Sequence, residues 1–158
     1  MEITAAKTLF RTLMDQHGFV GLDLKTDHAK NRLGYTAFSR QTGEPQFISF
    51  SIPVIQAIGE EQARMVALHE IAHAMTGYEY GDAHGPRWLR NNLIIGGDGK
   101  RTHTLPKEFI QAVSNYTVKC VAGHEHGHRN RVSKHVGLTP HRAVCVPHRS
   151  PVYLVPNR

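Results

Sequence analysis

The sequence contains no uncharged apolar run that approaches the roughly 18–20 residues of a membrane-spanning helix. Its first residues, Met1-Glu2-Ile3-Thr4, lack the basic and then apolar layout of a signal peptide. It has two cysteines, Cys120 and Cys145, which are too few for a disulfide scaffold. These absences exclude disulfide-rich classes and predict an intracellular protein, in the cytoplasm or at a nucleoid or nucleus, without a membrane partner. The 158 residues suit one compact domain with a small appendage, and we expect a monomer.

Acidic side chains are almost absent from the last third of the chain. Residues 1–110 contain 12 basic and 12 acidic residues, whereas residues 111–158 contain seven basic residues and one acid, Glu125. The whole net charge of +6 and six of the 12 histidines therefore lie in residues 111–158. Such a segment suits a polyanionic partner, a metal, or both, and a solvated basic tail is the alternative.

Hydrophobic periodicity predicts an α+β fold with two domains, residues 1–110 and 111–158. In the first domain we expect an N-terminal helix at residues 3–17 and then three strands that form a small antiparallel sheet, at residues 19–25, 33–39 and 46–52. Two further helices should follow, at residues 60–76 and 85–93. A short helix should follow at residues 107–113, and then a small hairpin module whose strands are at residues 116–121, 142–146 and 151–155.

The helix predicted over residues 60–76 contains the sequence His69-Glu70-Ile71-Ala72-His73. Two histidines four residues apart lie on one helical face and can bind one zinc ion, while Glu70 can transfer protons beside the metal. His84, eleven residues further on, can be the third ligand, with Glu79 or Asp82 as the next candidates. A random order of the same residues would show this five-residue pattern in about one of 20 sequences. The position of the motif on a helix with apolar neighbours is therefore needed as further evidence for a metal site.

The motif and the following His84-Gly85-Pro86-Arg87-Trp88 resemble the SprT-like (Spartan-type) zinc metalloproteases, and residues 32–36 and 48–51 resemble the strands of that family. The resemblance implies a zincin-like core and a zinc-dependent endopeptidase. It also implies that His69, His73 and His84 bind the catalytic zinc and that Glu70 is the general base. For Trp88 we expect a packing role under the site.

Many SprT-like proteins carry a C-terminal zinc ribbon with paired cysteines, and this chain departs from that pattern. It has Cys120-x3-His124 and Cys145-x2-His148, a Cys2His2 set that can bind a second, structural zinc in a zinc-ribbon-like module. His126, His128 or His141 can replace either histidine. Unligated core cysteines are the alternative.

Between the two Cys and His pairs lies a cationic stretch that can follow a phosphate backbone, formed by Arg129, Arg131, Lys134 and Arg142. No motif that reads bases is visible, so we expect non-specific DNA binding. The leading hypothesis is a metalloprotease that cleaves DNA-bound or DNA-crosslinked proteins, where the crosslink-repair part comes from the resemblance. The rivals are a general intracellular zinc peptidase without DNA dependence and a non-catalytic, zinc-containing DNA-binding regulator.

Overall fold

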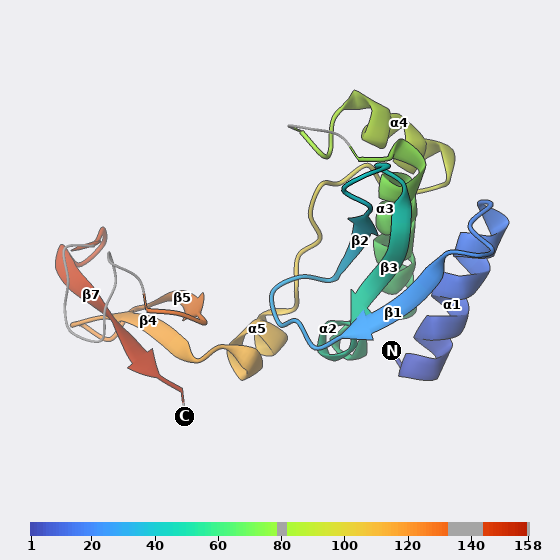
Figure 1. Cartoon of the computed structure of the whole chain (residues 1–158). Helices are drawn as coiled ribbons and strands as arrows, with labels where there is room; N and C mark the ends of the chain where they lie inside the picture. The colour runs from blue at the N-terminus through green and yellow to red at the C-terminus, as the bar shows by residue number, and fades with distance from the viewer. Residues whose placement is uncertain (79–81, 133–143, 158) are drawn as a thin grey trace. The chain divides into compact units, whose positions relative to one another are not determined.

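The computed structural model describes residues 1–78, 82–132 and 144–157 (Figure 1). The chain divides into two compact units, Met1–Leu105 and Pro106–Arg158. Both units contain α-helix and β-sheet, so the predicted mixed α and β content is confirmed. Among the described residues, no helix is long and apolar enough to cross a membrane.

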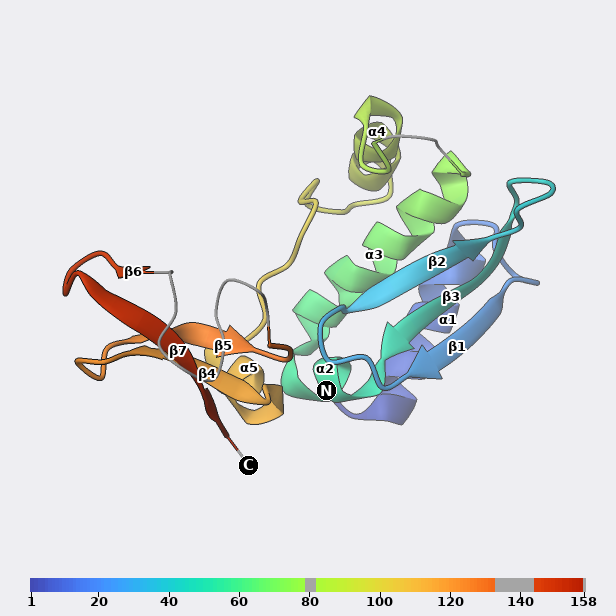
Figure 2. The same cartoon turned by 60° about the vertical axis from the view of Figure 1, so that its left-hand side comes forward.

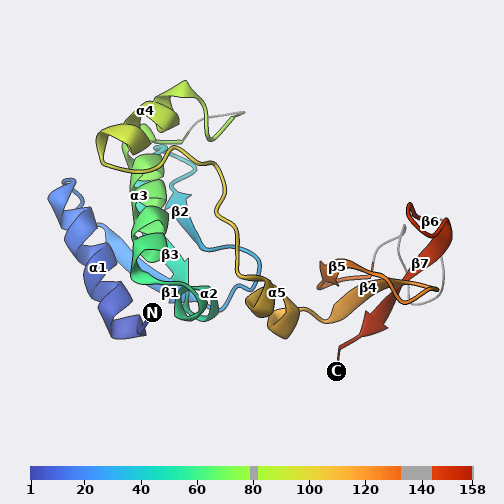
Figure 3. The same cartoon turned by 180° about the vertical axis from the view of Figure 1, so that it is seen from behind.

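The first unit places two helices on one face of a three-stranded sheet. The sheet consists of β1 (Asp23–Asp27), β2 (Gly34–Phe38) and β3 (Pro45–Ser51), with β3 in the centre. Helices α1 (Ile3–Gln16) and α3 (Glu60–Thr76) lie side by side over this sheet (Figure 3). The other helices in the described part of the unit are α2 (Ile52–Ala57) and α4 (Pro86–Ile94).

The expectation of an antiparallel sheet in this unit is wrong for one pair of strands. β2 pairs antiparallel with β3, but β1 pairs parallel with β3, in register from Asp23 opposite Phe47 to Asp27 opposite Ser51 (Figure 2). The connection from β1 to β2 therefore passes the end of β3 instead of forming a hairpin. Ser51 holds this connection, because its hydroxyl donates to the Ala29 carbonyl and its N–H donates to the Leu33 carbonyl.

The core of the first unit lies between α1, α3 and the sheet. Phe10 of α1 packs on Phe50 of β3 with ring centroids 4.5 Å apart, and both rings are fully buried. Three consecutive residues of α3, Val66, Ala67 and Leu68, are also buried, so this helix is enclosed on more than one side. α3 has the bounds that the sequence predicts, and it ends at Gly77, whose φ of 75° is the left-handed region that favours glycine.

In its described residues, the second unit is a four-stranded sheet preceded by one helix. Its elements are α5 (Lys107–Val113), β4 (Tyr116–Cys120), β5 (Glu125–Arg129), β6 (Val144–Cys145) and β7 (Ser150–Pro156). The strand order is β5-β4-β7-β6, and all pairs are antiparallel. A small core contains Val118, Cys120, Cys145, Val152 and Leu154. Strand β5 was not predicted, since its polar sequence Glu-His-Gly-His-Arg has no apolar alternation and its pairing depends on β4.

Candidate metal centre

Three histidines from two segments meet at one point of the first unit. His69 and His73 are one turn apart on α3, and His84 precedes α4. Their Nε2 atoms are 3.2 Å apart for His69 and His73, 3.1 Å for His73 and His84, and 3.0 Å for His84 and His69. The structure thus brings together the three predicted ligands as a nearly regular triangle of nitrogens.

Packing and hydrogen bonds hold the triangle in place. Trp88 is fully buried, and its ring centroid is 4.7 Å from those of His69 and His84, which agrees with the packing role expected for it. The Arg101 guanidinium donates to the His84 carbonyl (3.1 Å) and to the Asp82 carboxylate (2.7 Å). Asp82 in turn accepts the His84 N–H (3.1 Å). Asp82 is therefore engaged in fixing the His84 backbone, while the other alternative ligand, Glu79, lies outside the described residues.

The chemistry of the three rings fits a metal ion. Burial, followed by the other histidines, lowers the pKa of His69 to about 3, and burial followed by His84 lowers the pKa of His73 to about 4. The pKa of His84 is also lowered, by burial and by Arg101. All three imidazoles are then neutral near pH 7, and a neutral imidazole nitrogen is the form that binds a metal.

Glu70 is buried between α3 and β2, next to the histidine triangle. The Thr36 hydroxyl lies 2.9 Å from Glu70 Oε2 and 2.9 Å from the Glu70 carbonyl oxygen. Burial raises the pKa of Glu70 to about 7, against the lowering effects of Thr36 and Arg32. Such a carboxylate can accept a proton and return it near neutral pH.

Glycine at position 34 makes room for this carboxylate. A Cβ atom on Gly34 would lie 2.9 Å from the Ser49 carbonyl oxygen and 3.2 Å from Glu70 Oε1. The sequence pattern did not single out Gly34 or Thr36 as site residues, because they belong to a strand that is distant in sequence from the His69 to His73 motif.

Two cavities adjoin His69 and Glu70 on the side of β2. One of about 290 Å³ extends along residues 31–34, residues 101–103 and Leu105, and the other, of about 380 Å³, extends along Thr36, Phe38, Tyr78 and His84. Both cavities share Gly34, His69 and Glu70 in their walls. β2 is an edge strand of the sheet, so the hollowed surface follows a strand edge through the candidate site.

The second unit gathers its two cysteines with histidines. His148 Nδ1 is 3.4 Å from both Cys120 Sγ and Cys145 Sγ, and His124 Nδ1 is 3.6 Å from Cys145 Sγ. His126 also lies near, since His124, His126 and Cys145 offer ligand atoms within 4.8 Å of one another. Burial would raise the pKa of Cys120, but hydrogen bonds from His148 and His126 outweigh it and lower the pKa to about 5. These donors fit a metal ion.

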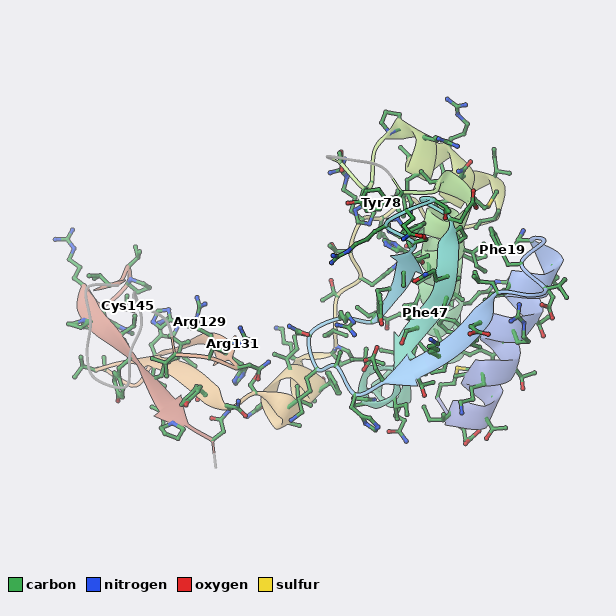
Figure 4. All side chains as sticks on the ribbon, viewed as in Figure 1. Phe19, Phe47, Tyr78, Arg129, Arg131 and Cys145 are labelled. Carbon is green, nitrogen blue, oxygen red and sulfur yellow. The ribbon has the colours of Figure 1, made fainter. Side chains whose placement is uncertain are left out.

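The remaining predicted site residues are only partly described. Arg129 ends β5 and Arg131 follows it, and both are exposed (Figure 4). Lys134, Arg142 and the alternative ligand His141 lie outside the described residues. The remaining alternative, His128, lies with its Nδ1 3.3 Å from the Thr117 hydroxyl.

A family model described as SprT-like family matches residues 5–105. The match includes all three histidines of the triangle and Glu70, and it stops at the end of the first unit. A search of curated protein sequences gave no match.

Proposed function

The chain belongs to the SprT-like family, and from that premise we propose that it is a zinc-dependent endopeptidase. The family is generally one of metallopeptidases, and the proposal adds the metal, the residues and the reaction. His69, His73 and His84 would hold the zinc, within a zincin-like core that occupies residues 1–110. Bound zinc would polarise the peptide carbonyl and acidify a water molecule.

The observation that carries this proposal is the position of Glu70 beside the histidine triangle. A purely structural metal site has no use for a carboxylate next to an open coordination position. Glu70 would accept the proton of the attacking water and pass it to the leaving amine, a task that suits a carboxyl whose pKa is about 7. Thr36 would orient the carboxylate through its hydroxyl.

An extended protein substrate fits the surface around the site. The two cavities continue on both sides of Glu70, and β2 offers a strand edge to which an extended peptide can add. A chain that passes through in this way would be cleaved internally, which favours an endopeptidase.

For the second unit we propose a structural zinc bound by Cys120, Cys145, His148 and His124, in a zinc-ribbon-like module over residues 111–158. The two thiols and His148 are mutually in contact, and the unit has only five buried apolar or cysteine side chains in its described core. A small core of this kind gains much of its stability from a metal. His126 is the rival of His124 for the fourth position.

The charge of residues 111–158 supports a role at DNA. We propose that they bind DNA without sequence preference and that the enzyme cleaves DNA-bound or DNA-crosslinked proteins. Exposed Arg129 and Arg131 support phosphate contacts, while Lys134 and Arg142 enter on the sequence alone. A general peptidase without DNA dependence is the alternative, and proteolysis measured with and without DNA separates the two.

The proposal is tested by zinc content and proteolysis of the full chain. We expect cleavage of an unfolded protein substrate that is lost with a chelator and restored by zinc. His73→Ala should lose one zinc per chain together with the activity, and Cys145→Ser should lose a different zinc and retain cleavage. Cleavage that persists in a metal-free preparation would overturn the proposal.

A further inference from the structure

The turn after α4 is tightly built and carries an aspartate. Asn92 of α4 is buried, and its Oδ1 accepts the Gly99 N–H at 2.8 Å. Gly97 lies so close to the Asn92 amide that a Cβ has no room, and Gly99 has φ of 70°. Asp98 accepts the Lys100 N–H at 3.0 Å and pairs with the Lys100 ammonium at 3.1 Å. These contacts hold the turn, and with it Asp98, in one position.

The segment that follows this turn runs beside α3 (Figure 3), and its residues Arg101, Thr102 and His103 line one of the two cavities together with His69. The Arg101 guanidinium donates a hydrogen bond to the His84 carbonyl. The Gln62 side-chain amide of α3 donates a hydrogen bond to the Thr104 carbonyl at 2.9 Å. Between these two attachments lies His103. Its side chain is only 10% exposed, and its ring centroid is 5.8 Å from that of His69.

Two ring nitrogens in this region are buried without a hydrogen-bond partner among the described residues, His69 Nδ1 and His103 Nε2. They belong to neighbouring rings, and the structure shows no hydrogen bond between them. The other nitrogen of each ring has a definite environment: His69 Nε2 faces the other two histidines of the triangle, and His103 Nδ1 is 4.0 Å from Asp98 Oδ2.

One assignment of protons fits all four nitrogens. His69 Nε2 must keep its lone pair for a metal, so the proton of this neutral ring is on Nδ1. The carboxylate of Asp98 favours a proton on His103 Nδ1, which leaves a lone pair on His103 Nε2. A donor on His69 and an acceptor on His103 are therefore complementary.

From this complementarity, and resting on the proposed metal site, we propose that His103 is a positioning residue that accepts the His69 Nδ1 proton when a metal holds His69 Nε2, with Asp98 beside the other ring nitrogen of His103. Metal-binding histidines commonly donate their second ring N–H to such a partner, which fixes the tautomer and the ring orientation. The Lys100 backbone acts on the pKa of His69 as a hydrogen-bond partner and is therefore the competing acceptor.

The test measures metal affinity and cobalt absorption of the full chain rather than activity alone. Cobalt bound by histidines only is distinguished from cobalt bound by Cys120 and Cys145, because thiolates add charge-transfer absorption.

His103→Ala should weaken binding at the all-histidine site about 10–100-fold and alter its cobalt spectrum, with an unchanged circular dichroism spectrum. His103→Gln offers a side-chain oxygen as acceptor and should recover most of the affinity. Asp98→Asn should weaken binding less than His103→Ala. His28→Ala, which removes an exposed histidine of the same unit, should leave the affinity unchanged.

The outcomes separate this inference from the proposed function. Wild-type affinity and spectrum in both His103→Ala and His103→Gln would overturn the role of His103 and assign the acceptor to Lys100. A wild-type chain that binds no metal at His69, His73 and His84 would overturn the proposed function as well.

Discussion

At the scale of single residues, the site depends on a small residue as much as on its ionisable ones. Glu70 is buried because β2 approaches α3 closely, and Gly34 permits this approach. The pKa of about 7 for Glu70 has burial as its largest cause, so any change that opens this contact alters both the position and the basicity of the carboxylate.

Gly34→Ala should therefore lower both stability and activity. The new methyl group meets the Ser49 carbonyl and the Glu70 side chain, and such overpacking costs about 1–3 kcal/mol. A displaced Glu70 should also reduce proteolysis about 100-fold. Denaturant unfolding and initial cleavage rates measure the two effects. Gly21→Ala is the control, because nothing lies within 4 Å of a Cβ there. Equal loss in both variants would remove the special role of position 34.

At the scale of elements, the sequence predicted helices better than strand neighbours. α3 and α5 have their predicted bounds, since helical periodicity and, for α3, the stop at Gly77 are local signals. The direction of β1 was wrong, because alternation shows which residues are buried but not which strand is adjacent. The three histidines could be predicted from their spacing, whereas Gly34, Thr36 and His103 come to the site only through tertiary contacts.

The connection between β1 and β2 depends on Asp27. Three groups donate to its carboxylate: the Ala29 N–H, the Ser49 hydroxyl and the Arg32 guanidinium. Burial alone would raise the pKa of Asp27, but these bonds outweigh burial and lower the pKa below 3.8. Because the pKa of Asp27 is lower in the folded state, its ionised carboxylate stabilises the fold at pH values above the unfolded-state pKa. This stabilisation is lost as the pH falls through the folded-state pKa.

Asp27→Asn should then destabilise the first unit by about 1–2 kcal/mol at pH 7. The difference from wild type should shrink as the pH falls below 3.8, where the wild-type carboxyl also becomes protonated. Urea unfolding at a series of pH values measures this difference. Asp23→Asn, at an exposed position of the same strand, is the matched control. A difference that is independent of pH would contradict the role given to the charge.

At the scale of the whole molecule, charge and proposed catalysis lie in different units. Residues 1–105 contain 11 basic and 11 acidic residues, so the net charge of +6 belongs to residues 106–158. The family match ends where the first unit ends. This division predicts that metal-dependent cleavage and attraction to phosphates can be separated.

A chain of residues 1–105 should keep the histidine site but bind DNA much more weakly, because it has no net field to attract phosphates. Neutralising Arg129, Arg131 and Lys134 in the full chain should flatten the salt dependence of DNA binding by up to about three units of slope. Fluorescence anisotropy over a series of salt concentrations measures both effects. If the shortened chain binds DNA as tightly as the full chain, with the same slope, the basic residues are not the anchor.

The central claim is that Glu70 moves protons at a metal held by three histidines, and Glu70→Gln tests it most directly. The amide keeps the shape of the side chain and the contact with Thr36 but cannot accept the proton. The measurement is the cleavage rate of a protein substrate by wild type and Glu70→Gln at equal zinc content per chain. The account predicts full zinc content and a rate at least about 100-fold lower. A variant that keeps its zinc and cleaves at the wild-type rate would contradict the account.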